Sequence, residues 1–311
     1  MQNIPYSYIS LQNGFWKAKE DLVRNSTVMA VYNRFAETHR FDALRCKWAE
    51  DAQYQGHVFW DSDIAKWIEG AAYLIKKQPD AQLESLCDNA IGHMVANADE
   101  NGYFNSYYLT VRQNERFTDR NQHELYCAGH LMEAAIAYAD ATGKDAFLKL
   151  MCRYADYIEK VFMVENSAAF VTPGHPELEL ALIKLYRATG QARYLRLAKF
   201  FIDQHGANNK DKSILSSTNY NQDVMPLRNI STAEGHSVRA LYLYCGMIDL
   251  AIEIGDQELA NACRRCFDNI YSRRMYITGG VGSSHLGEAF TVITIFPTVL
   301  PTQKPVLPLL W

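Results

Sequence analysis

Residues 124–162 read ELYCAGHLMEAAIAYADATGKDAFLKLMCRYADYIEKVF. Apolar residues recur at spacings of three and four on both sides of Gly143, a pattern that predicts two amphipathic helices, 124–143 and 146–162. Gly143 fits the left-handed position that commonly follows a helix. This stretch therefore predicts a hairpin of two helices.

The same unit occurs twice more along the chain. Helices that end at Gly190 and Gly255 are each followed within a few residues by another amphipathic helix. The leading helix of each unit opens with a Gly-His pair, and the pairs are Gly129-His130, Gly174-His175 and Gly235-His236. The predicted helices are 63–77, 83–98, 124–143, 146–162, 177–190, 192–205, 236–255 and 257–274. Strand signals are limited to 169–172 and 275–277.

Repeated helix pairs build either an open solenoid or a closed toroid. A solenoid repeats evenly, whereas the connections here are long, uneven and rich in aromatic and polar residues, as at 100–108 and 116–125. Such loops on a regular scaffold commonly carry a site. We therefore predict an all-α fold, an (α/α)6-type toroid of helix hairpins that is incomplete at its C-terminal end. Because fewer than six helix pairs are predicted, some apolar helix faces should be uncovered, and self-association is expected unless the tail covers them.

The composition excludes several classes of function. The 311 residues carry a net charge of -4 and are 48% hydrophobic, and no cluster of Lys and Arg indicates a nucleic acid or an anionic membrane as partner. No phosphate-binding loop, dinucleotide-binding motif or zinc-protease helix occurs. The expected partner is a small polar molecule such as a carbohydrate.

Cysteine usage indicates the compartment. The seven cysteines are odd in number and scattered through predicted helices, which is typical of reduced thiols. The first residues lack the basic and apolar regions of a secretory signal, so a cytoplasmic location is expected. Cys263 and Cys266 form a CxxC, but without a second ligand pair nearby they are expected to pack within a helix rather than hold a metal.

The candidate catalytic residue is Glu288, in the Gly-rich string ITGGVGSSHLGEAFT at 277–291. Glycines let a backbone approach a ligand closely. A carboxyl group held in such a turn can protonate a leaving-group oxygen if it is partly desolvated. The alternative is a solvated acid beside a flexible turn.

Four histidines are candidate substrate-binding residues. At or just before predicted helix N-termini stand His123, His130, His175 and His236. In a toroid these termini converge on one mouth, where imidazoles can hydrogen-bond sugar hydroxyls or orient a carboxylate. Helix capping or packing is the alternative for each of them.

The string FWDSD precedes the first predicted helix. Phe59 and Trp60 can stack on the apolar face of a sugar while Asp61 bonds its hydroxyls. The structural alternative is that Ser62 or Asp63 caps the helix.

A second aromatic segment is YFNSYY, at 103–108. So many phenol hydroxyls are difficult to satisfy inside a core. This segment is therefore expected to line a cavity.

Six motifs together resemble glycoside hydrolase family 127, the β-L-arabinofuranosidase group. They span roughly the first 291 residues and are FWDSDIAKWIEGAAY, DENGYFNSYY, NQHELYCAGHLMEAA, TPGHPELELALIKLYRATG, EGHSVRALYLY and ITGGVGSSHLGEAFT. The resemblance implies an (α/α)6 barrel followed by β-sandwich domains, and retaining hydrolysis of terminal β-L-arabinofuranosides. It also implies a zinc-bound cysteine thiolate as nucleophile and a glutamate as general acid and then base.

The same resemblance implies roles for individual residues. The glutamate of the GEAF motif is Glu288. The sugar-contacting histidines are His123, His175 and His236, with His130 as a further candidate, and the FWDSD segment lines the same pocket.

The sequence departs from the family after Thr291. In the family, GEAFT is followed by an ETC motif and later by a Cys-Cys pair, which supply the zinc ligands and the nucleophile, and neither occurs here. We expect an (α/α) barrel glycosidase-like domain at 1–291 and an aberrant proline-rich tail at 292–311, produced by a frameshift or a truncation. No cofactor is then expected in this chain, although zinc is expected in full-length relatives, and arabinofuranosidase activity should be weak or absent.

Three other functions stay open at this point. They are another (α/α) barrel sugar enzyme, of the unsaturated glucuronyl hydrolase or sugar epimerase type, a non-catalytic sugar-binding remnant, and a structural solenoid without a ligand. Activity that survives a chelator favours the first, and sugar binding without turnover favours the second. Absence of a central pocket favours the third.

Overall fold

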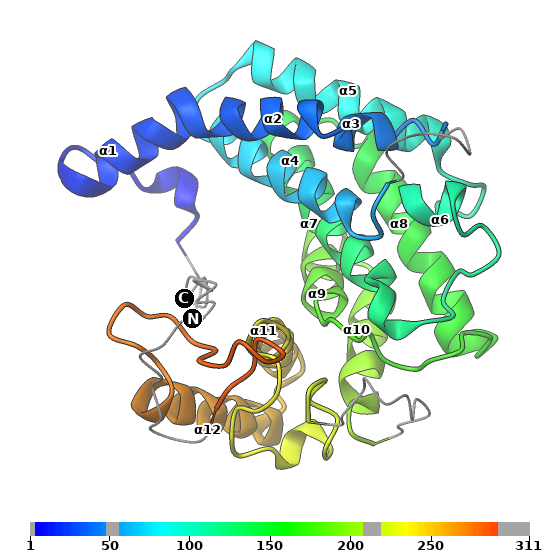
Figure 1. Ribbon diagram of the computed structural model, residues 1–311, viewed down its shortest axis with the longest axis vertical. Helices are drawn as coiled ribbons and strands as arrows, with labels where there is room; N and C mark the ends of the chain where they lie inside the picture. Colours follow the sequence, from blue (N-terminus) through cyan, green and yellow to red (C-terminus); the bar gives the residue numbers. More distant parts are fainter. Residues whose placement is uncertain (1–3, 48–55, 208–218, 292–311) are drawn as a thin grey trace. The chain divides into compact units, whose positions relative to one another are not determined.

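The structure, a computed structural model, describes residues 4–47, 56–207 and 219–291. The chain divides into two compact units: unit 1 comprises residues 1–116 and 130–157, and unit 2 comprises residues 117–129 and 158–311. Every regular element of the described residues is a helix, as Figure 1 shows. The strands predicted at 169–172 and 275–277 are therefore wrong. Residues 292–311, the predicted tail, lie outside the described residues.

Unit 1 contains the N-terminal helices and the paired helices α4 and α5. Its elements are η1 (Tyr6–Tyr8), α1 (Gly14–Leu22), the π-helical turn η2 (Val23–Thr27), α2 (Val28–Glu37), α3 (Arg40–Ala43), α4 (Trp60–Lys77), α5 (Ala81–Asn97), α6 (Ser106–Thr110), and most of α7 (Glu124–Thr142) and α8 (Ala146–Glu159). Gly143 separates α7 from α8 with a φ of 75°, as the sequence predicts. Ile64, Ile68 and Leu131 are fully buried members of the core.

Unit 2 contains two helical hairpins. Its elements are η3 (Arg120–Gln122), the first residues of α7, the π-helical turn η4 (Lys160–Val164), α9 (Leu178–Thr189), α10 (Ala192–Gln204), η5 (Leu227–Asn229), α11 (Ser237–Ile254) and α12 (Gln257–Arg273). Gly190 and Gly255 end α9 and α11 in the left-handed conformation. Helix α9 packs against α10 and α11, and α11 packs against α12 (Figure 1).

The predicted start of the first long helix needs a correction. Helix α4 begins at Trp60, so neither Ser62 nor Asp63 caps it. The Ser62 hydroxyl instead donates to the carbonyl oxygen of Phe59 at 2.7 Å. The Asp63 carboxylate accepts from Arg40 Nε at 2.9 Å. Both side chains therefore bond to other residues of unit 1 instead of capping α4.

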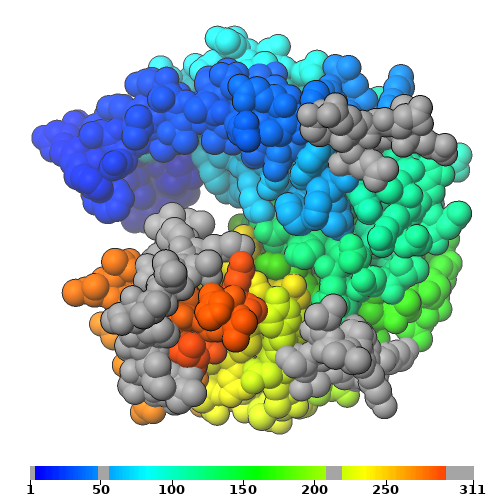
Figure 2. Space-filling view, viewed as in Figure 1, coloured from blue at the N-terminus to red at the C-terminus, as the bar shows by residue number. Residues whose placement is uncertain are grey.

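Helices α1 to α3 lie outside the predicted set, and they bury few side chains. Helix α1 buries no residue and α2 buries only Val28. Phe15 and Trp16 on α1 are 65% and 69% exposed, and Figure 2 shows α1 in dark blue at the surface. Exposed apolar side chains such as these were expected from the sequence. Self-association stays a prediction.

The segment at 103–108 belongs to the core, so its predicted role in lining a cavity is wrong. Tyr103, Phe104 and Tyr108 have no exposed surface. The neighbouring Gly102 has a φ of 80°, and a Cβ there would lie 2.6 Å from the Cβ of Arg153. This close approach brings the loop directly onto α8 within unit 1. The phenol rings are thereby enclosed by protein.

Candidate functional site

The loop that carries Glu288 is fastened to the N-terminus of α11. The Glu288 carbonyl oxygen accepts from the backbone N–H and the hydroxyl of Ser237, both at 3.0 Å. The N–H of Phe290 donates to the carbonyl oxygen of Gly235 at 2.9 Å, and His236 forms an isolated antiparallel bridge with Ala289. These bonds fix the backbone on both sides of the Glu288 carboxylate.

The same loop depends on unusual backbone angles. Gly282 has a φ of 82°, and a Cβ there would lie 2.3 Å from the Ser237 hydroxyl. Glu288 itself has a φ of 50°, in the left-handed region that residues with a side chain seldom occupy. Strain of this kind collects at functional sites, where the surrounding structure maintains it.

His236 orients the Glu288 carboxylate. Its Nδ1 accepts from the backbone N–H groups of Val238 and Arg239, at 3.1 and 3.4 Å, and so caps α11. A ring nitrogen that accepts carries no proton, which places the proton of the neutral ring on Nε2. Nε2 lies 3.1 Å from Glu288 Oε2, so this N–H is directed at the carboxylate. The Glu288 side chain is 34% exposed and can meet a ligand.

His175 has the opposite tautomer. Its Nδ1 lies 2.9 Å from the carbonyl oxygen of Pro176, which can only accept, so Nδ1 carries the proton and Nε2 is an acceptor. Burial, and next the positive charge of Arg239, hold the pKa of His175 well below its usual range. The ring is therefore neutral at neutral pH. It offers a hydroxyl group an acceptor rather than a donor.

The rings of His123, His175 and His236 form a row in unit 2. The centroids of His123 and His175 lie 5.6 Å apart, and those of His175 and His236 lie 5.9 Å apart. His123 precedes α7 with a φ of 61°. The structure thus brings together three of the four predicted histidines, and through His236 also Glu288.

Three tyrosines border this row, and sequence reasoning missed them. The ring centroid of Tyr126 lies 4.3 Å from that of His175, and the centroid of Tyr242 lies 5.7 Å from it. Tyr220 lies 5.5 Å from His236. Tyr126 follows His123 by three residues at the start of α7, and this spacing on a helix was the one available signal.

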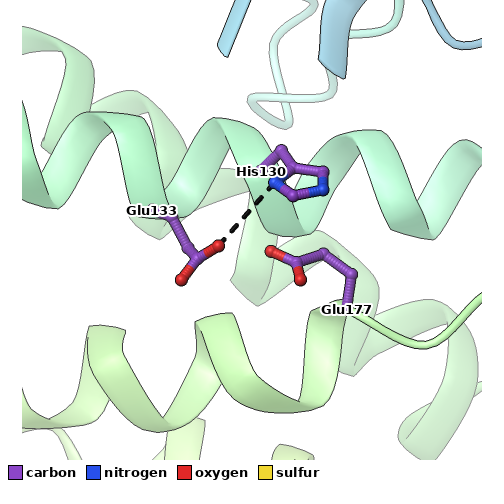
Figure 3. A group of neighbouring side chains, drawn as sticks. All are labelled: His130, Glu133 and Glu177. Atoms are coloured by element: carbon purple, nitrogen blue, oxygen red, sulfur yellow. Dashed lines mark ion pairs between the residues drawn. The ribbon is translucent and has the colours of Figure 1, made fainter. Parts of the chain in front are cut away.

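His130 does not stand at a helix N-terminus as predicted. It lies inside α7, in unit 1, with 3% of its surface exposed. Its Nδ1 lies 3.7 Å from a carboxylate oxygen of Glu133, one helical turn later, and Figure 3 shows this ion pair. Figure 3 also draws Glu177, which immediately precedes α9 in unit 2. The histidine that directly precedes the N-terminus of α7 is His123.

The FWDSD residues make local contacts within unit 1. Both Asp61 carboxylate oxygens accept from Ser106, one from its N–H at 2.7 Å and one from its hydroxyl at 2.6 Å. Burial raises the pKa of Asp61 to about 6, although these hydrogen bonds favour the charged form. Trp60 lies under the Arg40 guanidinium at 5.1 Å, and the Phe59 ring lies 4.1 Å from that of His57. Contact of these residues with a sugar stays a prediction, and for Asp61 the bonds to Ser106 favour an anchoring role.

Of the seven cysteines, four do not fit a zinc-bound thiolate. All seven lie in the described part of the chain, and Cys263 and Cys266 are buried in α12 as predicted. Burial raises the pKa of Cys46, Cys87 and Cys263 to about 12 and that of Cys266 to about 11, so these groups are thiols. Among the described residues, no cysteine belongs to a group of side chains close enough together to hold a metal ion.

None of the described helices combines the length and the apolar composition needed to cross a bilayer.

Comparison with known proteins finds similarity to β-L-arabinofuranosidases. The sequence model of the GH127 catalytic domain of β-L-arabinofuranosidases matches residues 8–303. The non-reducing end β-L-arabinofuranosidase of Bifidobacterium longum subsp. longum is 33% identical over 323 residues, which cover 91% of this chain and 49% of that protein. The chain therefore spans about half the length of this relative.

Solved structures agree with this result. A crystal structure of a GH127 β-L-arabinofuranosidase from Geobacillus stearothermophilus T6 superposes with a TM-score of 0.86 at 40% identity, over 93% of this chain and 49% of that one. The structure of a GH127 β-arabinofuranosidase superposes with a TM-score of 0.87 at 32% identity, over 94% of this chain and 47% of that one. The all-α, (α/α)-type fold class is thereby confirmed.

Proposed function

Because this chain belongs to the GH127 family of β-L-arabinofuranosidases, we propose that it binds a terminal β-L-arabinofuranosyl unit and that Glu288 is its general acid and base. The observation that carries the proposal is the 3.1 Å contact between Glu288 Oε2 and His236 Nε2, beside the ring of His175. It joins a partly exposed carboxyl group to imidazoles whose hydrogen-bonding roles are fixed.

The two imidazoles have complementary tasks in this proposal. His175 Nε2 accepts the hydrogen of a sugar hydroxyl, and His236 Nε2–H holds the carboxylate of Glu288 in place. In the first step of a retaining hydrolysis, Glu288 gives its proton to the oxygen of the leaving group as the glycosidic bond breaks. In the second step its carboxylate takes a proton from the attacking water, and the acid is restored.

The nucleophile is the part that this chain does not supply. A zinc-bound thiolate serves this purpose in the family pattern, and Cys87, Cys263 and Cys266 here are buried thiols of raised pKa. A carboxylic acid alone lacks the nucleophile that forms the covalent intermediate. Purified chain is therefore expected to bind the sugar with negligible turnover.

Calorimetry with methyl β-L-arabinofuranoside tests the binding site. Removal of the sugar's hydrogen-bond acceptor in His175→Ala is expected to weaken binding by about tenfold or more, and His236→Ala should also weaken it because Glu288 loses the N–H that orients it. The matched control is His285→Ala, which removes an exposed histidine from the loop that carries Glu288. Absence of binding by the unaltered chain, or an equal loss in His285→Ala, would contradict the proposal.

A chromogenic β-L-arabinofuranoside tests the chemistry. Any residual turnover should disappear in Glu288→Gln, because an amide cannot exchange the proton. Turnover that persists in Glu288→Gln would remove the assigned role of Glu288. Turnover that needs Glu288 and survives a chelator would instead indicate a helical sugar enzyme with another nucleophile.

A further inference from the structure

A buried network of charged side chains surrounds the loop that carries His175. Its members are Arg120, Glu179, His205, Asp223 and Arg239, and each of them is 6% exposed or less. All five belong to unit 2. Burial of so many charges is costly unless every charge is paired and hydrogen-bonded, so their arrangement requires a physical reason.

Two arginines hold the residues before His175. Arg120 Nη2 donates to the hydroxyl of Thr172 at 2.9 Å and to the carbonyl oxygen of Pro173 at 3.2 Å. Arg239 Nη1 donates to the carbonyl oxygen of Gly174 at 2.6 Å. A Cβ on Gly174 would lie 2.6 Å from the carbonyl oxygen of Arg120, so the loop is packed tightly against η3.

Glu179 holds the residue after the loop. One of its carboxylate oxygens accepts from the N–H of Glu177 at 3.2 Å, and the other lies 3.1 Å from His205 Nε2. His205 Nδ1 lies 2.9 Å from Asp223, whose second oxygen pairs with Arg120 Nη2 at 2.7 Å. His205 thus joins the anchor on one side of the loop to the anchor on the other side.

His205 can make both contacts only as an imidazolium. Each of its ring nitrogens faces a carboxylate oxygen, so both nitrogens must donate. Burial alone would lower the pKa of His205, but the hydrogen bonds to Asp223 and Glu179 outweigh it and raise the pKa to about 9. A neutral ring would direct a lone pair at one of the two carboxylates.

We propose that His205 is a positioning residue for sugar recognition. By linking Asp223 to Glu179 it fixes the loop that carries His175. This loop in turn keeps Nε2 of His175 as a hydrogen-bond acceptor. This inference rests on the proposed sugar-binding role of His175. His205 itself has no exposed surface, so it acts on a ligand only through other residues. Its effect reaches the sugar through the backbone on either side of His175.

The state of the His175 ring is a direct readout. In chain labelled with ¹⁵N-histidine, long-range ¹H–¹⁵N spectra distinguish a ring protonated at Nδ1 from one protonated at Nε2. In His205→Gln, glutamine can donate to one carboxylate but turns an oxygen toward the other. We expect His175 to lose its single Nδ1–H signature in this variant, while His236 keeps its Nε2–H signature.

A matched control separates positioning from general loss of stability. Arg228→Gln also removes contacts with two carboxylates in unit 2, those of Asp203 and Asp256, at 2.7 Å each. It should lower stability without changing the signature of His175. In the double variant H205Q/E179Q, the amide at 179 can donate to the amide at 205 and still accept from the N–H of Glu177. This variant should recover the signature.

Sugar binding supplies the second readout. Calorimetry with methyl β-L-arabinofuranoside should show binding weakened by about tenfold or more in His205→Gln and unchanged in Arg228→Gln. If the unaltered chain binds no sugar, the proposed function fails while the ring spectra still test this inference. A folded His205→Gln chain that keeps the Nδ1–H signature of His175 would overturn it. Should that variant fail to fold, Asp223→Asn, which keeps the side-chain shape, is subject to the same two outcomes.

Discussion

The charge of His205 should appear as a pH-dependent contribution to stability. Its pKa is raised from an ordinary value of 6.5 to about 9 in the folded chain by Asp223 and Glu179, although burial opposes this. A difference of this size corresponds to about 3 kcal/mol. Because the folded pKa is the higher one, the stabilisation is complete below about pH 6.5 and is lost as the pH rises through about 9. The free energy of unfolding should therefore fall across this window.

Urea unfolding followed by circular dichroism, at a series of pH values from about 6 to about 10, measures this fall. Other groups titrate in the same range, so the decisive quantity is the difference between the unaltered chain and His205→Gln. The curve of His205→Gln should be flatter by about 3 kcal/mol, whereas Arg228→Gln should keep the slope of the unaltered chain. Parallel curves for the unaltered chain and His205→Gln would refute the argument that a buried imidazolium holds this network.

Three further perturbations follow from the geometry. Gly282→Ala should destabilise the chain by at least about 1 kcal/mol in urea unfolding, because it forces a side chain into the left-handed region and against the Ser237 hydroxyl; an unchanged midpoint would contradict this. Phe201→Ala empties a fully buried position and should lower the free energy of unfolding by about 3–5 kcal/mol. The control Tyr271→Ala, at a residue that is 64% exposed, should change it by no more than about 0.5 kcal/mol. Equal losses in the two variants would contradict the burial argument. Because the pKa of His175 is lowered in the folded chain, its neutral ring favours folding above pH 6.5, and this contribution is lost as the pH falls through the folded pKa. His175→Gln should therefore make the free energy of unfolding less sensitive to acid. An unchanged dependence on pH below 6.5 would exclude a buried neutral ring at this position.

Periodicity was sufficient for the helices that bury a wide face. The eight predicted segments correspond to α4, α5 and α7 to α12, with ends that differ by a few residues. Helices α1 and α2 were not predicted: their sequences are amphipathic, but almost none of their residues is buried. The aromatic residues at 103–108 were predicted to line a cavity but belong to the core. Gly102, with its positive φ, lets this loop pack closely against α8, and amino-acid composition alone does not reveal such a close approach.

The candidate site was predictable where a local signal existed. Glycines beside Glu288, and histidines ahead of α9 and α11, are visible in the sequence, and the structure brings Glu288, His175 and His236 together. His205 had no such signal. It directly follows α10 as an ordinary histidine. Its partners Glu179 and Asp223 lie 26 and 18 residues away, in segments that only the fold brings together.

The left-handed backbone at Glu288 suggests that this position is maintained for its carboxylate at a cost in stability. A residue with a Cβ pays about 1–2 kcal/mol in that region, which glycine avoids. Glu288→Gly and Glu288→Ala both remove the carboxylate and its partly exposed contact with His236, so they differ mainly in the strain of the backbone. Glycine also gives the unfolded chain more freedom, which offsets part of that difference.

Glu288→Gly should therefore be the more stable of the two variants, by about 0.5–1 kcal/mol in urea unfolding, although glycine normally lowers stability relative to alanine. Both variants should lack any Glu288-dependent turnover. If Glu288→Ala is the more stable, the backbone at 288 is not strained, and its φ of 50° cannot be taken as a sign of function. If glycine is favoured, the loop retains glutamate at a measurable cost, which is the expected relation between stability and activity at a catalytic position.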